Sequence, residues 1–187
     1  MSNTKKMSRI AILSAVLVSL ALVSNYVTIG TVNINLALIP IVIGACLYGP
    51  LVGFVLGMLD GFIIIFAPST LALFMTHNPF FTIVLCLLKT GIGGLVSGYI
   101  YRFLKNKNDA LAVLLAAIAL PIINTLIFIL GVVLFFIPVY MNLAGGKNVI
   151  TFIFISTFTT NFLIEFLVNI VLSSSIHRVI KFKSNKN

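Results

Sequence analysis

The most informative segment of the chain runs from residue 34 to residue 67 and reads INLALIPIVIGACLYGPLVGFVLGMLDGFIIIFA. Its only charged residue is Asp60, and most of the others are apolar. A membrane-spanning helix needs about 20 apolar residues, so the segment is too long for one span and short for two. Gly49-Pro50 lies near its middle and predicts a tight reversal, because proline cannot continue a helix and glycine permits the turn. The segment therefore predicts either two short membrane helices or one re-entrant hairpin.

The rest of the chain has the same apolar character. Of its 187 residues, 60% are hydrophobic and 8% are charged, and the mean hydropathy is +1.22. A soluble domain of this size needs a polar surface, which so few charged residues cannot supply. Six helices of about 20 residues would use most of the chain and leave only short loops and tails. The composition therefore predicts an all-α integral membrane bundle, with residues 1–187 forming a single transmembrane domain.

The apolar runs, separated by Gly, Pro and polar loops, predict six transmembrane helices. We expect them at about 10–29, 34–48, 51–67, 80–103, 110–138 and 149–176. The first run also fits a secretory signal peptide, since a basic segment precedes it. No Ala-x-Ala cleavage site follows, so we interpret it as a membrane helix. No internal repeat is evident in the sequence, which argues against a secondary transporter built from inverted repeats.

The net charge of +9 is concentrated in three clusters that flank apolar runs. They lie before the first run, in the loop 102–109 and in the tail 178–187, and hold ten of the twelve Lys and Arg residues. Positive charge resists translocation, so such clusters mark the cytoplasmic side. The distribution predicts that both termini are cytoplasmic. It also argues against a nucleic-acid partner, which would require a basic face on a soluble domain.

Three charged residues fall inside predicted membrane helices, namely Asp60, Lys89 and Glu165. A charge at this depth is costly and normally faces the bundle interior or a water-filled cavity. One interpretation is a structural ion pair between Lys89 and one of the carboxylates. The other is that these residues line a ligand pocket.

The last predicted helix carries a polar stripe. Asn161, Glu165 and Asn169 recur at i, i+4 and i+8 and so share one face, and Thr157 extends it outward. Such a stripe serves either interhelical hydrogen bonds or a ligand pocket open to the outside. In the second case Asn124, on the preceding helix, would contribute to the pocket.

Motifs for catalysis and metal binding are missing from the sequence. Cys46 and Cys86 lie in apolar runs, where cysteine packs as a small hydrophobe, and no Cys/His ligand spacing occurs. Residues 141–148 lack the glycine and Ser/Thr of a phosphate-binding loop. The sequence predicts no enzymatic activity, no metal and no cofactor. Active transport would require an ATPase on another chain.

Several motifs together point to a known family. They are Asn35-Leu-Ala-Leu-Ile-Pro40 with Gly44, Tyr48-Gly49-Pro50-Leu-Val-Gly53, Asn78-Pro79, Leu88-Lys89-Thr90-Gly91, Pro121 to Asn124, and Ala11-x-x-x-Ala15. Over nearly the whole chain this arrangement resembles the substrate-binding S component of energy-coupling factor (ECF) vitamin transporters. The resemblance implies six helices, tight binding of a vitamin or its precursor near the outer face, and no chemistry. A transmembrane T component and two ATPases would supply the work.

The resemblance also implies roles for particular residues. By position it places the ligand pocket at Asn33, Asn35, Asn78, Asn124 and Asn161. Three residues discussed above complete the expected pocket. They are Lys89 and Glu165, which are charged residues inside membrane helices, and Thr157, which extends the polar stripe. Ala11, Ala15 and Ser19 form a small-residue stripe that would let a helix of the T component approach closely. The stretch 78–91 is most similar to pantothenate-type members of the family. Pantothenate is therefore the first candidate substrate, and Lys89 would contact its carboxylate. Riboflavin is the second candidate substrate.

Two other classes of function stay open. A stand-alone secondary transporter would use Asp60 and Glu165 as proton sites and would need no ATPase partner. A membrane scaffold without transport activity would bind no small ligand.

Overall fold

The computed structural model describes residues 3–25, 28–29, 32–33, 35–155 and 162–184. These residues form a helical bundle with one very short hairpin, in which β1 (Thr28–Ile29) pairs antiparallel with β2 (Val32–Asn33). The prediction of a helical architecture is confirmed. The helices are α1 (Asn3–Ser24), α2 (Leu38–Tyr48), α3 (Pro50–Ile65), α4 (Pro68–Thr70), the π-helical turn η1 (Leu71–Met75), α5 (Pro79–Leu104), α6 (Asp109–Phe135), α7 (Ile137–Ala144), α8 (Val149–Ile155) and α9 (Leu163–Ser184).

Three helices, α1, α5 and α6, are long and apolar enough to cross a membrane. A fourth span results if α3 is taken together with Pro68–Met75, from which it is bent by 65°. The apolar helix α2 has 11 residues and so rises about 16 Å, roughly half of a hydrocarbon core. Within the described ranges the structure thus supports three or four spans by length and composition, where the sequence predicts six.

The predicted helix ends need correction in the first third of the chain. The first helix begins at Asn3 and ends at Ser24, whereas the sequence predicts 10–29. Its end is early because Thr28 and Ile29 are β-branched and take up extended backbone in the hairpin. The second helix begins at Leu38 instead of residue 34, since the side chain of Asn35 accepts a hydrogen bond from the Ala37 N–H and holds the chain in a turn.

The later helices also differ from the prediction. The run 110–138 ends as α6 at Phe135, and α7 starts two residues later with Pro138 near its beginning, where its missing N–H is tolerated. Within the predicted helix 149–176, the structure describes α8 up to Ile155 and α9 from Leu163, and α9 continues beyond the prediction to Ser184. Residues 156–161, which include Thr157 and Asn161, lie outside the described residues.

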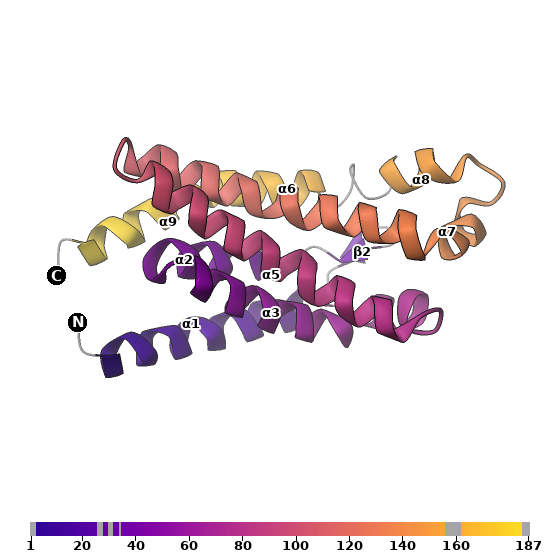
Figure 1. Ribbon diagram of the computed structural model, residues 1–187, viewed down its shortest axis with the longest axis horizontal. Coiled ribbons are helices and arrows are strands. Elements are labelled where there is room, and N and C mark those ends of the chain that lie inside the picture. The colour runs from indigo at the N-terminus through magenta and orange to yellow at the C-terminus, as the bar shows by residue number, and fades with distance from the viewer. Residues whose placement is uncertain (1–2, 26–27, 30–31, 34, 156–161, 185–187) are drawn as a thin grey trace.

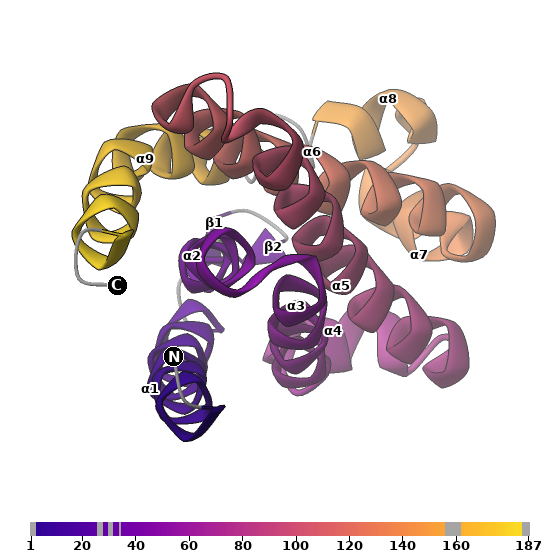
Figure 2. The ribbon, with the colours of Figure 1, turned by 60° about the vertical axis from the view of Figure 1, so that its left-hand side comes forward.

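The reversal at Gly49-Pro50 agrees with the sequence interpretation. Gly49 has φ of 105°, which favours glycine, and Pro50 begins α3 where its missing N–H is not needed. The structure has two helices joined by a tight turn, a feature that both alternatives for residues 34–67 share. Figure 2 shows the short α2 enclosed by neighbours, and it packs against α1, α3, α5, α6 and α9.

Helices α3 and α5 are in direct backbone contact through glycine. Gly53, Gly57 and Gly61 recur every fourth residue on α3. A Cβ atom added at Gly57 would lie 2.2 Å from the backbone oxygen of Thr90, and one at Gly53 would lie 2.4 Å from that of Gly94. Small residues at this spacing let two membrane helices approach closely. We call this contact the glycine seam.

Two apolar cores lie along the bundle with polar residues between them. The first core centres on Leu17, Leu38, Ile41, Leu56, Val113, Leu120 and Ile176, and the second on Phe74, Leu85, Ile129, Val132, Phe136, Tyr140 and Ile153. On α6 the buried Asn124 falls between Leu120 and Ile129. On α5, Lys89 and Thr90 follow Leu85 of the second core. We call the buried polar residues between the cores the polar layer. Its members are Asn35, Asp60, Asn124, Glu165 and Asn169.

The basic segments gather at one end of the bundle. Figure 1 shows the start of α1, the end of α9 and the connection between α5 and α6 at this end, while α7 and α8 lie at the other. These segments carry the three basic clusters of the sequence. The arrangement agrees with the expectation that both tails lie on one side of a membrane.

Candidate functional site

The polar layer is organised by Asn35, which joins two helices to the segment before α2. Its Nδ2 donates a hydrogen bond to Asp60 Oδ2 on α3 at 2.7 Å, and its backbone N–H donates to Glu165 Oε1 on α9 at 3.0 Å. Its own Oδ1 accepts from the Ala37 N–H at 3.0 Å. Asp60 is 0% exposed and Glu165 4% exposed. Two buried carboxylates are thus bridged by one asparagine.

Glu165 extends this network to α6 and along α9. Asn124 Nδ2 on α6 donates to Glu165 Oε2 at 3.5 Å, a long hydrogen bond. Asn169 Nδ2, one turn further along α9, donates to the backbone oxygen of Glu165 at 2.8 Å. The layer therefore connects α3 to α9 through Asn35, and α9 to α6 through Glu165.

The local sequence explains why Asn35 is free to bridge. It lies outside any helix, so its N–H is not used in a helical ladder and can reach a carboxylate. The end of α1 supports the same segment, because Ser24 Oγ accepts from the Leu36 N–H at 2.9 Å and donates to the Leu20 oxygen at 2.7 Å. A short non-helical segment deep in an apolar bundle is tolerated because neighbouring helices satisfy its backbone groups.

Lys89 does not form the ion pair that one sequence interpretation predicts. Among the described residues, which include all three acids of the chain, the one ion pair joins His177 Nε2 to Asp109 Oδ2 at 3.1 Å. The Lys89 ammonium instead lies 5.3 Å from the centre of the Phe128 ring, in a cation–π contact. It remains within electrostatic reach of Asp60 and Glu165. Amide groups, not an ammonium, hold the two carboxylates.

Among the residues that the structure describes, three buried oxygen atoms of the layer have no hydrogen-bond partner. They are Asp60 Oδ1, Asn124 Oδ1 and Asn169 Oδ1. A buried acceptor without a partner costs about 1–3 kcal/mol, so such atoms are rare in folded proteins. An arrangement with three of them in one layer is chemically prepared to receive a molecule that donates hydrogen bonds.

The structure brings together some of the predicted site residues and separates others. Asn35, Asn124 and Glu165 meet in the polar layer, with Lys89 beside it. Asn78 lies apart, at the start of α5, where its Oδ1 accepts from the Phe81 N–H at 3.2 Å and caps the helix. Asn33 pairs with Thr28 through the backbone of the hairpin. Thr157 and Asn161 are not among the residues that the structure describes.

Two members of the layer were not among the residues predicted to bind substrate. The sequence leaves Asp60 open as an ion-pair partner, a pocket residue or a proton site, and it places Asn169 only in the polar stripe. The signal for Asn169 was its i+4 spacing from Glu165 on one helix face. Asp60 is the only charged residue of segment 34–67, but its contact with Asn35 has no signature in the sequence.

The small-residue stripe of α1 faces away from the bundle. Ala11, Ala15 and Ser19 are exposed, whereas Leu17 and Ala21 of the same helix are buried against the first core. The Ser19 hydroxyl is occupied by a hydrogen bond to the Ala15 oxygen at 3.0 Å. The stripe thus exposes small side chains, and its one hydroxyl group already donates a hydrogen bond within the helix.

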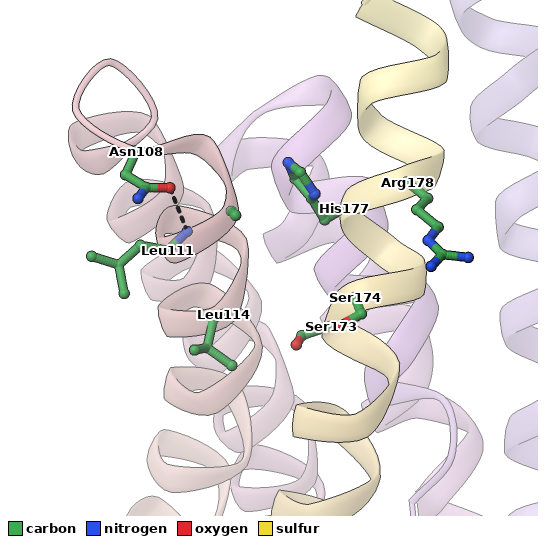
Figure 3. Close-up of a pocket in the computed structure, with 8 residues that line it drawn as sticks. Asn108, Leu111, Leu114, Ser173, Ser174, His177 and Arg178 are labelled. Carbon is green, nitrogen blue, oxygen red and sulfur yellow. Dashed lines mark hydrogen bonds between the residues drawn. The ribbon is translucent and has the colours of Figure 1, made fainter.

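A pocket of about 400 Å³ opens at the basic end, between the start of α6 and the second half of α9. It is lined by Asn108, Ala110, Leu111, Leu114, Ser173, Ser174, His177 and Arg178. Figure 3 shows Arg178 directed away from α6 and the Asn108 side chain bonded to the Leu111 N–H. His177 is paired with Asp109. Asn108, Ser173 and His177 of this pocket therefore serve local structure, unlike the polar layer with its unpaired oxygens.

Comparisons with known proteins identify the family. Within the described ranges, no three His, Cys, Asp or Glu side chains are placed to hold a metal ion. No curated protein and no solved structure shows a significant match. The family described as the substrate-specific component of the ECF transporter matches residues 5–177, almost the full length. Members are transporter subunits, not enzymes. This chain is a membrane protein and belongs to the family of ECF transporter substrate-specific components.

Proposed function

We propose that this chain is the high-affinity binding subunit of an ECF-type importer for a water-soluble vitamin or vitamin precursor, with the polar layer as part of its ligand site. The observation that carries the proposal is the buried network of Asn35, Asp60, Glu165 and Asn124, which retains unpaired acceptors. A network that served only packing would be expected to satisfy its own atoms. Ligand sites are mostly apolar with a few converging polar groups. The polar layer has this composition, because its polar groups converge between two apolar cores.

The same proposal includes the membrane topology and the partners. The protein would be a multi-pass protein of the cell membrane with both termini in the cytoplasm, which the common position of the three basic clusters supports. A T component would dock on the exposed stripe of Ala11, Ala15 and Ser19. Two ABC ATPases would then supply the energy, since the sequence has no phosphate-binding loop.

Pantothenate is the first candidate substrate, because the stretch 78–91 is most similar to pantothenate-type members. Riboflavin is the second. Its flat ring system would require an aromatic stacking partner, for which the chain offers 16 Phe and 5 Tyr residues. Both compounds carry several hydroxyl groups, which suit a layer of acceptors.

A thermal-shift screen of the purified protein against water-soluble vitamins tests the proposal. A ligand at 100 times its Kd should stabilise the protein by about 2.7 kcal/mol. We predict that Asn124→Leu weakens binding of the stabilising vitamin by about 5- to 150-fold, because a buried polar contact is worth about 1–3 kcal/mol. The matched control is Asn142→Leu, the same substitution at an exposed position of α7.

Equal affinity in a folded Asn124→Leu variant would return Asn124 to a packing role. Uptake that runs on a proton gradient without the ATPases would instead favour the secondary transporter. A protein that no vitamin stabilises would favour the scaffold. The three outcomes are separable in one set of purified proteins and proteoliposomes.

A further inference from the structure

The unpaired polar atoms of the polar layer are all acceptors. Asp60 Oδ1, Asn124 Oδ1 and Asn169 Oδ1 have no hydrogen-bond partner within the described part of the chain. Each corresponding amide nitrogen already makes one hydrogen bond, because Asn124 and Asn169 both direct Nδ2 toward oxygens of Glu165, and Asn35 directs Nδ2 toward Asp60. Each amide keeps a second N–H and Lys89 keeps its ammonium N–H groups, but among the buried side-chain nitrogen and oxygen atoms of the described residues only the three oxygens have no hydrogen-bond partner at all.

This excess of acceptors does not depend on how the amide groups are oriented. Turning Asn169 over would place its oxygen 2.8 Å from the backbone oxygen of Glu165. Turning Asn124 over would place its oxygen against the Glu165 carboxylate. Either change would oppose two acceptors, so the hydrogen-bond pattern fixes the orientations.

The charges in the layer point the same way. Two carboxylates, Asp60 and Glu165, face one ammonium group, and Lys89 makes no ion pair with either of them. Lys89 is packed on the ring of Phe128 instead. A buried carboxylate that has hydrogen bonds but no ion-pair partner still lacks a compensating charge. A ligand group that donates hydrogen bonds or carries positive charge would relieve both deficits, and a carboxylate would deepen them.

We propose that the ligand enters the polar layer with a hydrogen-bond-donating or cationic end, such as hydroxyls, a ring N–H edge or an ammonium group, directed at Asp60 and Asn124, and that no carboxylate is seated there. The inference rests on the proposed function and sharpens it. It differs from the sequence expectation that Lys89 meets the carboxylate of the substrate. A pantothenate molecule would enter hydroxyl end first, with its carboxylate outside the layer.

The test uses probes that differ in one group. Pyridoxamine, pyridoxine and 4-pyridoxic acid share a ring and carry an ammonium, a hydroxyl and a carboxylate at the same position, and panthenol is pantothenate with its carboxylate replaced by a hydroxymethyl group. Riboflavin and thiamine complete the panel. Calorimetry on the purified full-length protein measures each Kd. We expect the donor-bearing member of every pair that binds to bind at least as tightly as its carboxylate partner.

The variants locate the contact. Asp60→Asn should weaken the best probe at least tenfold, while Asp109→Asn, the same substitution in the His177 ion pair at the basic end, should leave its Kd unchanged. Glu165→Gln provides a second neutralisation if Asp60→Asn does not fold, as judged by the ligand-free thermal midpoint. Preference for a carboxylate probe, lost in Lys89→Gln and kept in Asp60→Asn, would overturn this inference but leave the proposed function intact. A panel in which nothing binds would contradict the proposed function itself.

Discussion

Two stripes of small residues run along two helices of this protein and have opposite fates. On α3, Gly53, Gly57 and Gly61 are buried against the backbone of α5. On α1, Ala11 and Ala15 have the same four-residue spacing and are exposed. In the apolar part of α1, 17% of the residues are buried within the bundle, compared with 39% in the apolar part of α5. The glycine stripe of α3 thus packs against another helix of the same chain, whereas the alanine stripe of α1 is exposed on the surface of the bundle.

The difference shows what a small-residue pattern means in a membrane helix. The pattern permits another backbone to come close, because no side chain intervenes, but it does not say which backbone. In the glycine seam the partner is α5, and even a methyl group would collide with it. For the α1 stripe, our proposal assigns the partner to a separate subunit.

The largest effect is expected from filling the glycine seam. A Cβ at Gly57 would lie 2.2 Å from the Thr90 oxygen, which belongs to backbone and cannot rotate away. We predict that Gly57→Ala lowers the free energy of unfolding by at least about 1–3 kcal/mol, as overpacking does elsewhere, and that Gly57→Leu prevents folding. The measurement is thermal unfolding in detergent.

The control for this prediction is Gly93→Ala on α5. The nearest atom to a Cβ there is the Leu120 oxygen at 3.3 Å, a contact that a small shift relieves. Alanine also favours a helix over glycine by up to about 1 kcal/mol. If Gly57→Ala and Gly93→Ala unfold at the same temperature, the close contact of α3 and α5 does not limit stability and the comparison fails.

The second largest effect concerns the exposed stripe. We predict that Ala11→Trp or Ala15→Trp abolishes ATP-driven uptake and copurification with the T component, while the Kd for the ligand stays near that of the wild type. The bulk would block close approach of a partner helix, and both residues are exposed, away from the polar layer. Uptake assays in proteoliposomes and calorimetry in detergent measure the two effects separately.

Val16→Trp is the matched control, because Val16 is 46% exposed but lies about 100° around the helix from Ala15. Uptake that survives both alanine substitutions would show that α1 is not the docking surface. A parallel loss of ligand affinity would show instead that the stripe belongs to the packing of the bundle.

The smallest effect is expected from the one side chain that bonds across the glycine seam. Thr90 Oγ1 donates to the Gly57 oxygen at 2.7 Å, and it also lies within reach of the Cys86 oxygen. We predict that Thr90→Val, which keeps the shape, lowers the free energy of unfolding by about 0.6 kcal/mol and at most about 1.7 kcal/mol. Thr76→Val is the control, because that hydroxyl is exposed and bonds only within its own turn.

A loss well above this range would mean that hydrogen bonding, more than close packing, holds α3 to α5. The glycine and threonine variants together therefore separate the two contributions to the seam. Both are measured by the same unfolding experiment.

Much of the fold could be predicted from local sequence. The reversal at Gly49-Pro50 depends on backbone restrictions within two residues, and the structure has it with φ of 105° at Gly49. The start of α5 at Pro79 after Asn78 follows the same kind of short-range rule. The end of α1 and the start of α2 could not be predicted, because Ser24 and Asn35 form hydrogen bonds with residues of other segments.

The candidate site was predictable only in part. Asn124 and Glu165 were expected to line a pocket because polar residues in apolar helices need a polar neighbour. Asp60, which Asn35 links to Glu165, was not assigned to it, and Lys89 was expected to contact a carboxylate of the protein or of the ligand. Its actual place over Phe128 depends on the packing of α5 against α6.

By itself, the sequence determined three properties: that this is a membrane protein, that its chain reverses at Gly49-Pro50, and to which family it belongs. Each depends on hydropathy, backbone restrictions or motifs, which are properties of neighbouring residues. The tertiary structure decided which polar groups meet and which small-residue stripe is buried. Asn35 reaches Asp60 across 25 positions and Glu165 across 130. Such contacts are selected by how whole helices pack, since each helix offers several faces of similar composition and packing chooses among them.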